Sequence, residues 1–172
     1  MSLSIHEGSV PVLARVLSNV AGIVEKGRLH AESEKIDPTV LLGMRLYPNM
    51  FAFTRQVQVV SDTAKGCVAR LASVEAPKYP DTESSFAELK ERLEKTLAFV
   101  NGFKPRQLDG ADGRPVVLKF PNSTLNFNSG WDYLLSFALP NLYFHSSMAY
   151  AILRHGGVKL GKSDYLGNIG GG

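Results

Sequence analysis

Residues 85–102 read SFAELKERLEKTLAFVNG and carry the complete signal of a helix that buries one face. Ser85 and Glu88 match a capping box, in which the serine side chain accepts from the N3 amide and the glutamate bonds back to the N-cap amide. Asn101-Gly102 is a helix stop. Large apolar residues recur at three- and four-residue steps, the period of an amphipathic helix: Phe86, Leu89, Leu93, Leu97 and Val100.

Two segments that precede this helix show the same period. Residues 9–34 are expected to form a first helix with Ser9 as its N-cap, because a serine hydroxyl accepts a bond from the free amides of a first turn. Residues 49–74 are expected to form a second helix, with Pro48 at its first position. The connection KIDPTVLLGMRLYPNM is rich in large apolar side chains, so we expect it to pack over the helices.

Two short segments after the third helix alternate in the manner of strands. They read VVLKF (116–120) and STLNFN (123–128), and Pro121-Asn122 separates them. Alternation at a period of two residues around a short turn predicts a small β-hairpin.

A last helix is expected to begin at Asn128 or Ser129 as its N-cap and to run to about His155. Pro140 lies inside it. Because proline lacks an amide hydrogen and clashes with the preceding turn, we expect a kink between Phe137 and Pro140.

Four helices with a hairpin between the third and the fourth predict an all-α bundle. A chain of 172 residues, 44% hydrophobic and 20% charged, is expected to form one domain over residues 1–172. The glycine-rich end, about residues 164–172, is expected to be an extended tail.

The bulk composition argues against several classes of partner. The net charge is only +3, and the 19 basic residues are scattered along the chain rather than clustered, so no nucleic-acid partner is expected. The N-terminal segment lacks the features of a signal peptide, and no apolar stretch is long enough to cross a bilayer, which predicts a cytoplasmic protein without a membrane partner. Cys67 is the single cysteine, so an internal disulfide and a cysteine-based zinc site are excluded, and we expect Cys67 to be a small buried hydrophobe.

The candidate site lies in the stretch NLYFHSSMAYAILR, residues 141–154. Asn141 and His145 are one helical turn apart, so their side chains share a face. Gln58 and Asp62 have the same spacing on the second helix. Helical bundles build metal sites from such facing side chains, and imidazole with oxygen donors suits zinc, nickel, iron or manganese. The alternative is a hydrogen-bonded polar network without a metal.

Several longer stretches resemble the DinB/YfiT-like superfamily of four-helix bundles, and more closely a subgroup known only as a domain of unknown function. The stretches are SVPVLARVLSNV, KIDPTVLLGMRLYPNMFAFTRQVQ, SFAELKERLEKT, FALPNLYFH and AYAILRHGGVKLGKSDYLG. The resemblance implies an up-down-down-up bundle, often dimeric. It also implies a divalent metal held by three histidines, used in some relatives for thiol transfer.

Transferred to this chain, the resemblance implies a degenerate metal site. His145 matches the second ligand of the last helix, Asn141 stands where the first would be, and Gln58 lies near the ligand position of the second helix. One imidazole and two neutral carboxamides are a weak donor set for zinc.

We therefore expect a metal-free pocket for a small-molecule ligand, or a structural homodimer. The pocket is predicted to be lined by Phe53, Gln58, Asp62, Asn141 and His145. The alternative is a hydrolase or thiol S-transferase that uses Zn or Ni at His145, Asn141 and Gln58.

The expected homodimer has two candidate interface segments, which are also suited to covering the chain's own bundle. They are the connection (Leu41, Leu42, Met44, Leu46 and Tyr47) and the tail (Tyr165, Leu166 and Ile169).

Overall fold

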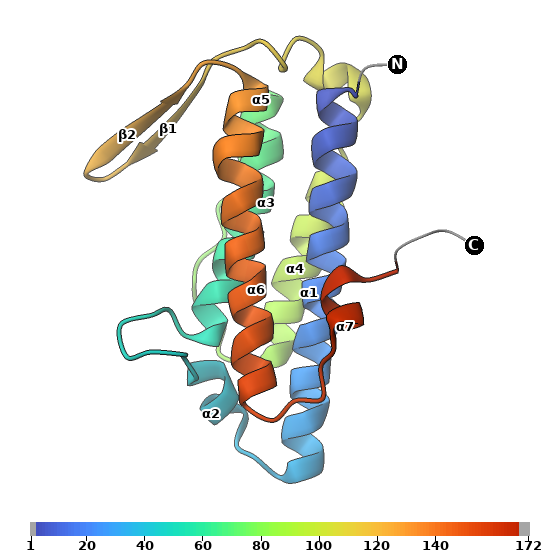
Figure 1. Cartoon of the computed structure of the whole chain (residues 1–172), viewed down its shortest axis with the longest axis vertical. Helices are drawn as coiled ribbons and strands as arrows, with labels where there is room; N and C mark the ends of the chain where they lie inside the picture. Colours follow the sequence, from blue (N-terminus) through green and yellow to red (C-terminus); the bar gives the residue numbers. More distant parts are fainter. Residues whose placement is uncertain (1–2, 169–172) are drawn as a thin grey trace.

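The computed structural model describes residues 3–168 and contains four long helices arranged as a bundle (Figure 1). The helices are α1 (Ile5–Glu34), α3 (Phe53–Leu71), α4 (Phe86–Asn101) and α6 (Leu139–His155). Helices α3 and α4 run in the same direction, opposite to α1 and α6, because the segment between α3 and α4 returns along the bundle (Figure 1). Each of α1 and α3 packs chiefly against an antiparallel neighbour, α1 against α4 and α3 against α6. This is the expected up-down-down-up bundle.

Capping boxes begin two of the long helices. At α4 the predicted box is present: Ser85 Oγ accepts from the Glu88 amide at 3.2 Å, and Glu88 accepts from the Ser85 amide at 3.1 Å. At α1 the cap is Ser4, paired with Glu7, and not Ser9. Ser9 is buried inside the helix, where its hydroxyl donates to the Ile5 carbonyl at 2.6 Å. The S-x-x-E pattern at residues 4–7 was the signal for the earlier start.

Helix α3 begins at Phe53, four residues later than predicted, and ends at Leu71. The preceding segment forms a loop closed by a bond from the Phe53 amide to the Met44 carbonyl at 2.8 Å. Arg45 also donates to the carbonyls of Pro48 and Met50 at 3.3 and 3.2 Å. Pro48 therefore lies in a turn of this loop rather than in the first turn of the helix.

The connection also contains a short helix, α2 (Pro38–Gly43), which packs onto the bundle. Leu41 and Leu42 are buried in it, with 2% and 5% of their surface exposed. These two residues belong to the core of the monomer and are not available for the predicted dimer interface.

The last helix starts at Ser129 as its N-cap, as α5 (Gly130–Tyr133), and continues into α6 through a π-helical turn over Leu134–Ala138. The Leu139 amide bonds to the Leu134 carbonyl five residues earlier. Since Pro140 cannot donate an amide bond and its ring crowds the preceding turn, a wider turn accommodates both effects. The disturbance predicted between Phe137 and Pro140 takes this form.

The predicted hairpin is present, as β1 (Val116–Phe120) and β2 (Ser123–Phe127). The strands are antiparallel, with Val116 opposite Phe127 and Phe120 opposite Ser123. The hairpin projects from the bundle near the start of the last helix (Figure 1). Phe127 packs on Tyr133 and Phe137, which anchors the hairpin on the first turns of that helix.

The prediction of an extended tail over residues 164–172 is wrong for residues 164–166, which belong to a short helix, α7 (Lys162–Leu166). An ion pair of 2.6 Å joins Asp164 to Lys26 of α1, and Asn19 donates to the Tyr165 carbonyl at 2.9 Å. These contacts with α1 hold α7 against the bundle. Residues 169–172, including Ile169, lie outside the described residues.

Within residues 3–168, no helix is both long enough and apolar enough to span a membrane.

Two glycines of α1 give a test of the bundle packing. A Cβ on Gly27 would lie 2.8 Å from Leu153 Cδ1 and 2.9 Å from Phe86 Cε1, whereas one on Gly22 meets nothing within 4 Å. Gly22→Ala is expected to stabilise the protein by up to about 1 kcal/mol through helix propensity. Gly27→Ala gains the same propensity but overpacks the core, at a cost of about 1–3 kcal/mol. Urea unfolding of the two variants measures the difference, and equal stabilities would contradict this packing.

Candidate functional site

His145 and Asn141 both face α3, as predicted, but their partners are not the predicted ones. His145 Nδ1 lies 2.7 Å from Gln56 Oε1, and Asn141 Nδ2 donates to Thr63 Oγ1 at 2.8 Å. Positions 56 and 63 are two turns apart and share one face of α3, whereas position 58 is rotated by about 200° from position 56. The prediction used the face of α3 that carries Gln58 and Asp62, and it missed the face that carries Gln56 and Thr63.

The orientation of the Gln56 amide identifies the histidine tautomer. Gln56 Nε2 donates to the Phe51 carbonyl at 3.3 Å, which leaves Oε1 as the acceptor for His145. His145 Nδ1 therefore carries the hydrogen, and the lone pair of the neutral ring is on Nε2. The ring is half-buried between two aromatic neighbours: it stacks with Phe51 at 6.2 Å and meets the edge of Phe144 at 5.1 Å.

The pKa of His145 is lowered from its ordinary value. Burial is the main cause, since it disfavours the charged imidazolium, and the positive charge of Arg55 adds to the effect. His145 is thus kept as a neutral hydrogen-bonding group at neutral pH.

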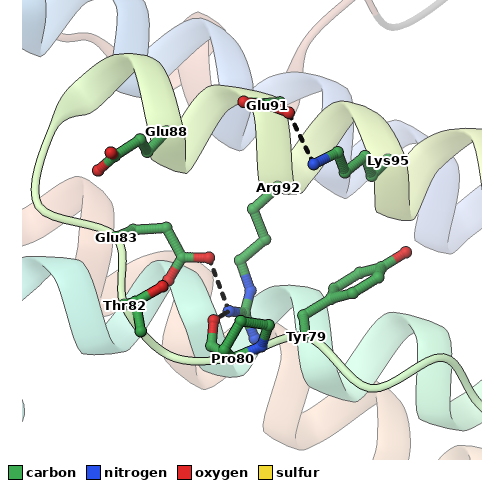
Figure 2. A pocket seen from close by; sticks show the side chains of 8 residues that line it. All are labelled: Tyr79, Pro80, Thr82, Glu83, Glu88, Glu91, Arg92 and Lys95. Carbon is green, nitrogen blue, oxygen red and sulfur yellow. Dashed lines mark hydrogen bonds and ion pairs between the residues drawn. The ribbon is translucent and has the colours of Figure 1, made fainter.

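Gln58 and Asp62 point to a different place, a charged cluster around Arg92 of α4. The Arg92 guanidinium, with 3% of the residue exposed, contacts Asp62 at 2.8 Å, Glu83 at 2.9 Å and Asp81 at 3.0 Å. Gln58 Nε2 donates to the other oxygen of Glu83 at 2.8 Å. The Arg92 side chain reaches from α4 to the segment that precedes this helix, beside Glu83 (Figure 2).

The Arg92 cluster joins α3, α4 and the returning segment. Arg92 also donates to the Pro80 carbonyl at 3.1 Å, and Lys65 adds a second cation at 2.8 Å from Asp62. Burial raises the pKa of Glu83, but the hydrogen bonds from Arg92 and Gln58 outweigh burial and leave that pKa lowered. The carboxylate is therefore held in its charged form.

A cleft of about 210 Å³ borders this cluster (Figure 2). It lies between α4 and the segment before it, lined by Tyr79, Pro80, Thr82, Glu83, Glu88, Glu91, Arg92 and Lys95. Glu88 is bonded to the amides of Ser84 and Ser85, and Glu91 is paired with Lys95 at 2.6 Å. These bonds cap the start of α4 and pair two side chains on its surface.

Phe53 was predicted to line the pocket but is a core residue. It is completely buried and packs on Phe86 of α4 at 5.9 Å. Cys67 is also completely buried, as expected, and burial raises the pKa of its thiol to about 12.

A second cavity, also of about 210 Å³, lies between α3 and the last helix, against strand β1; we call it the hairpin groove. Its lining residues are Arg55, Val59, Asp62, Thr63, Arg70, Leu118, Phe120, Tyr133, Phe137 and Asn141. Asp62 and Asn141 are thus the two predicted pocket residues that line one cavity. The aromatic and arginine side chains of the groove were missed, because the packing of the hairpin on Tyr133 and Phe137 leaves no periodic signal in the sequence.

The predicted metal ligands do not form a ligand set. Gln58 is bonded to Glu83 in the Arg92 cluster, while Asn141 is bonded to Thr63 and His145 to Gln56. No group of three or more His, Cys, Asp or Glu suited to a metal ion occurs among the residues that the structure describes. A zinc site needs about three converging protein ligands, and these bonds do not bring Gln58, Asn141 and His145 together.

The up-down-down-up topology and the packing of α3 against α6 are those of a DinB-like four-helix bundle. A crystal structure of a DinB family member from Shewanella denitrificans is similar to this chain, with a TM-score of 0.86 and 38% sequence identity, over 96% of this chain and 93% of that one. A family model described as "Domain of unknown function (DUF1993)" matches residues 5–166, and the chain belongs to this family. No curated protein matches it. The resemblance seen in the sequence is confirmed.

Removing the central cation should destabilise the Arg92 cluster. Arg92→Met leaves the largely buried Glu83, the partly exposed Asp62 and the exposed Asp81 without their shared partner, so we expect a loss of about 2–4 kcal/mol in unfolding free energy. Arg92→Lys keeps the positive charge but not the planar guanidinium with its several donors, and should lose less unfolding free energy than Arg92→Met. Lys95→Met, which removes an exposed cation one turn along α4, serves as the control in urea unfolding. Equal behaviour of Arg92→Met and Lys95→Met would contradict this account.

The lowered pKa of His145 predicts a dependence of stability on pH. As the pH falls through the ordinary histidine value of about 6.5, the unfolded chain takes up the proton before the folded chain does, so stability decreases. His145→Gln, which cannot be protonated, should lose less stability than the original chain between pH 7 and pH 5.5. An NMR titration should give His145 a pKa below 6.5. A value above 6.5 would refute the assignment.

Proposed function

We propose that this chain binds a small molecule in the hairpin groove and does so without a metal. The observation that carries the proposal is the composition of the groove. One cavity combines arginine and amide side chains with aromatic and aliphatic ones, at the interface between α3 and the last helix. Ligand sites of proteins have this combination, an apolar lining with a few polar groups that orient the ligand.

The bonding of the polar residues supports a metal-free site. Asn141 Nδ2 and His145 Nδ1 each bond to a side chain of α3, so both residues already take part in hydrogen-bonded pairs across this interface. The alternative of a hydrolase or thiol S-transferase with Zn or Ni rests on the family resemblance. It would require His145 to use its Nε2 lone pair together with ligands from outside the predicted trio.

A homodimer is a second proposal, with a different surface. Large apolar side chains near the loop before α3 and on α6 are exposed, and Phe51 and Phe144 flank the His145 ring. The exposed residues are Leu46, Tyr47, Phe51, Tyr143 and Phe144. An exposed apolar cluster of this kind favours association between protein surfaces. Sedimentation equilibrium gives the mass of the particle directly.

Two measurements on the purified chain test the proposed function. Elemental analysis after growth with added Zn and Ni should find far less than one ion per chain, with no difference in His145→Ala. Ligand-observed NMR with a set of small aromatic acids, amides and amines should find binders. Val59→Phe fills the groove and should abolish their binding, whereas Val40→Phe, the same change on the exposed face of α2, should not.

A stoichiometric ion that is lost in His145→Ala would favour the metal-dependent enzyme instead. Binding that survives in Val59→Phe would place the ligand outside the groove.

A further inference from the structure

We propose that the ligand of the hairpin groove is a small organic carboxylate with an apolar body, and that Arg70 of α3 pairs with its carboxylate. This inference rests on the proposed function, because it names the class of molecule that the same groove takes. It follows from the charges in the groove, the position of the Arg70 guanidinium and the apolar residues that complete the lining.

The charges that line the groove are balanced except for one. Asp62 is paired with Arg92 and Lys65, each at 2.8 Å, and Arg55 is paired with Asp81. For Arg70, no carboxylate lies within ion-pair distance among residues 3–168. The groove therefore presents one unmatched positive charge, and charge complementarity calls for a ligand with one negative charge.

Arg70 is held in place by a neighbour that carries no charge. Its Nη1 donates to the Tyr133 hydroxyl at 3.2 Å, and its guanidinium carbon lies 6.0 Å from the centre of the Tyr133 ring. A guanidinium has five N–H donors in a planar fork that matches a carboxylate with two parallel bonds. One bond to Tyr133 orients the fork and leaves donors for a ligand.

Gly66 provides the space in which Arg70 lies. A Cβ at this position would collide with Arg70 Nη1, and the next nearest atoms, at 3.4 and 3.6 Å, also belong to the Arg70 guanidinium. Gly66 is in the interior of α3, where glycine lowers helix stability relative to alanine. A basic residue in the last turn of a helix is favourable wherever its side chain lies, so the helix dipole alone does not explain why Arg70 is folded back over a glycine.

The rest of the groove suits an apolar body. Val59, Leu118, Phe120 and Phe137 contribute aliphatic and aromatic surface, and Thr63 and Asn141 are already bonded to each other. A phosphate dianion would place a second negative charge in a groove that also contains Asp62, with only one unmatched cation. A monocarboxylate is therefore the better match.

The test uses three probes of one shape: phenylacetate, phenylacetamide and 2-phenylethylamine. Their dissociation constants are measured by NMR titration of the ¹⁵N-labelled full chain at constant ionic strength. Phenylacetate should bind at least about tenfold more tightly than the amide, since the carboxylate adds an opposite charge and a second acceptor oxygen for the guanidinium, and the amine should bind most weakly. Arg70→Gln should reduce phenylacetate to the affinity of the amide.

Gly66→Ala should displace the Arg70 guanidinium without removing the arginine, and it therefore tests whether the position of this group matters. We expect this variant to lose the preference for phenylacetate while its melting temperature is unchanged or raised, because alanine favours the helix. Arg154→Gln removes an exposed arginine at the same place in α6, its last turn, and should leave all three affinities unchanged. If Arg70→Gln fails to fold, Gly66→Ala decides the question alone.

The outcomes separate the two proposals. Equal affinities for phenylacetate and phenylacetamide in the original chain would overturn the carboxylate assignment and leave the proposed function standing. A preference for phenylacetate that persists in Gly66→Ala, or in a folded Arg70→Gln, would overturn the role of Arg70. A complete lack of groove shifts with all three probes would overturn the proposed function itself.

Discussion

The ion cluster around Arg92 is the interaction on which the arrangement of the bundle depends. In this topology α3 and α4 run in the same direction, so the segment between them must travel back along the bundle. That segment has no helix or strand of its own to satisfy its polar groups. Arg92 meets this requirement from α4, because its buried guanidinium bonds to Pro80, Asp81 and Glu83 of the segment and to Asp62 of α3.

The same cluster explains why only part of the predicted pocket, Asp62 and Asn141, lines one cavity. Gln58 and Asp62 have the spacing of a facing pair, and the sequence pattern alone directs them at the last helix. In the folded chain Arg92 and Glu83 attract them to the side of α4. The face of α3 that meets Asn141 and His145 is formed instead by Gln56 and Thr63. These two residues belong to no sequence motif that would have marked them.

The hairpin has a comparable effect on the other side of α3. A two-stranded hairpin is marginally stable by itself and must be supported by packing. Phe127 anchors it on Tyr133 and Phe137, and strand β1 then forms one wall of a groove whose other walls come from α3 and the last helix. A cavity therefore exists where the bundle alone would present only a helix surface, and Arg70 and Tyr133 lie inside it.

From the sequence one can read the four helices, the hairpin, the capping box at Ser85 and the inward face of Asn141 and His145, because these follow from periods and caps within short segments. The missed start at Ser4 was also readable, as a second S-x-x-E pattern. The later start of α3 at Phe53 depends on the loop that Met44 and Arg45 close, and the helix α7 depends on contacts with α1. The π-helical turn is the local form of the disturbance that Pro140 predicts. The choice of partner for each polar side chain, and the groove with Arg70 seated over Gly66, were settled only in three dimensions. Local patterns specify which way a side chain points from its own helix, but what it meets there depends on how the helices are rotated and on what packs beside them.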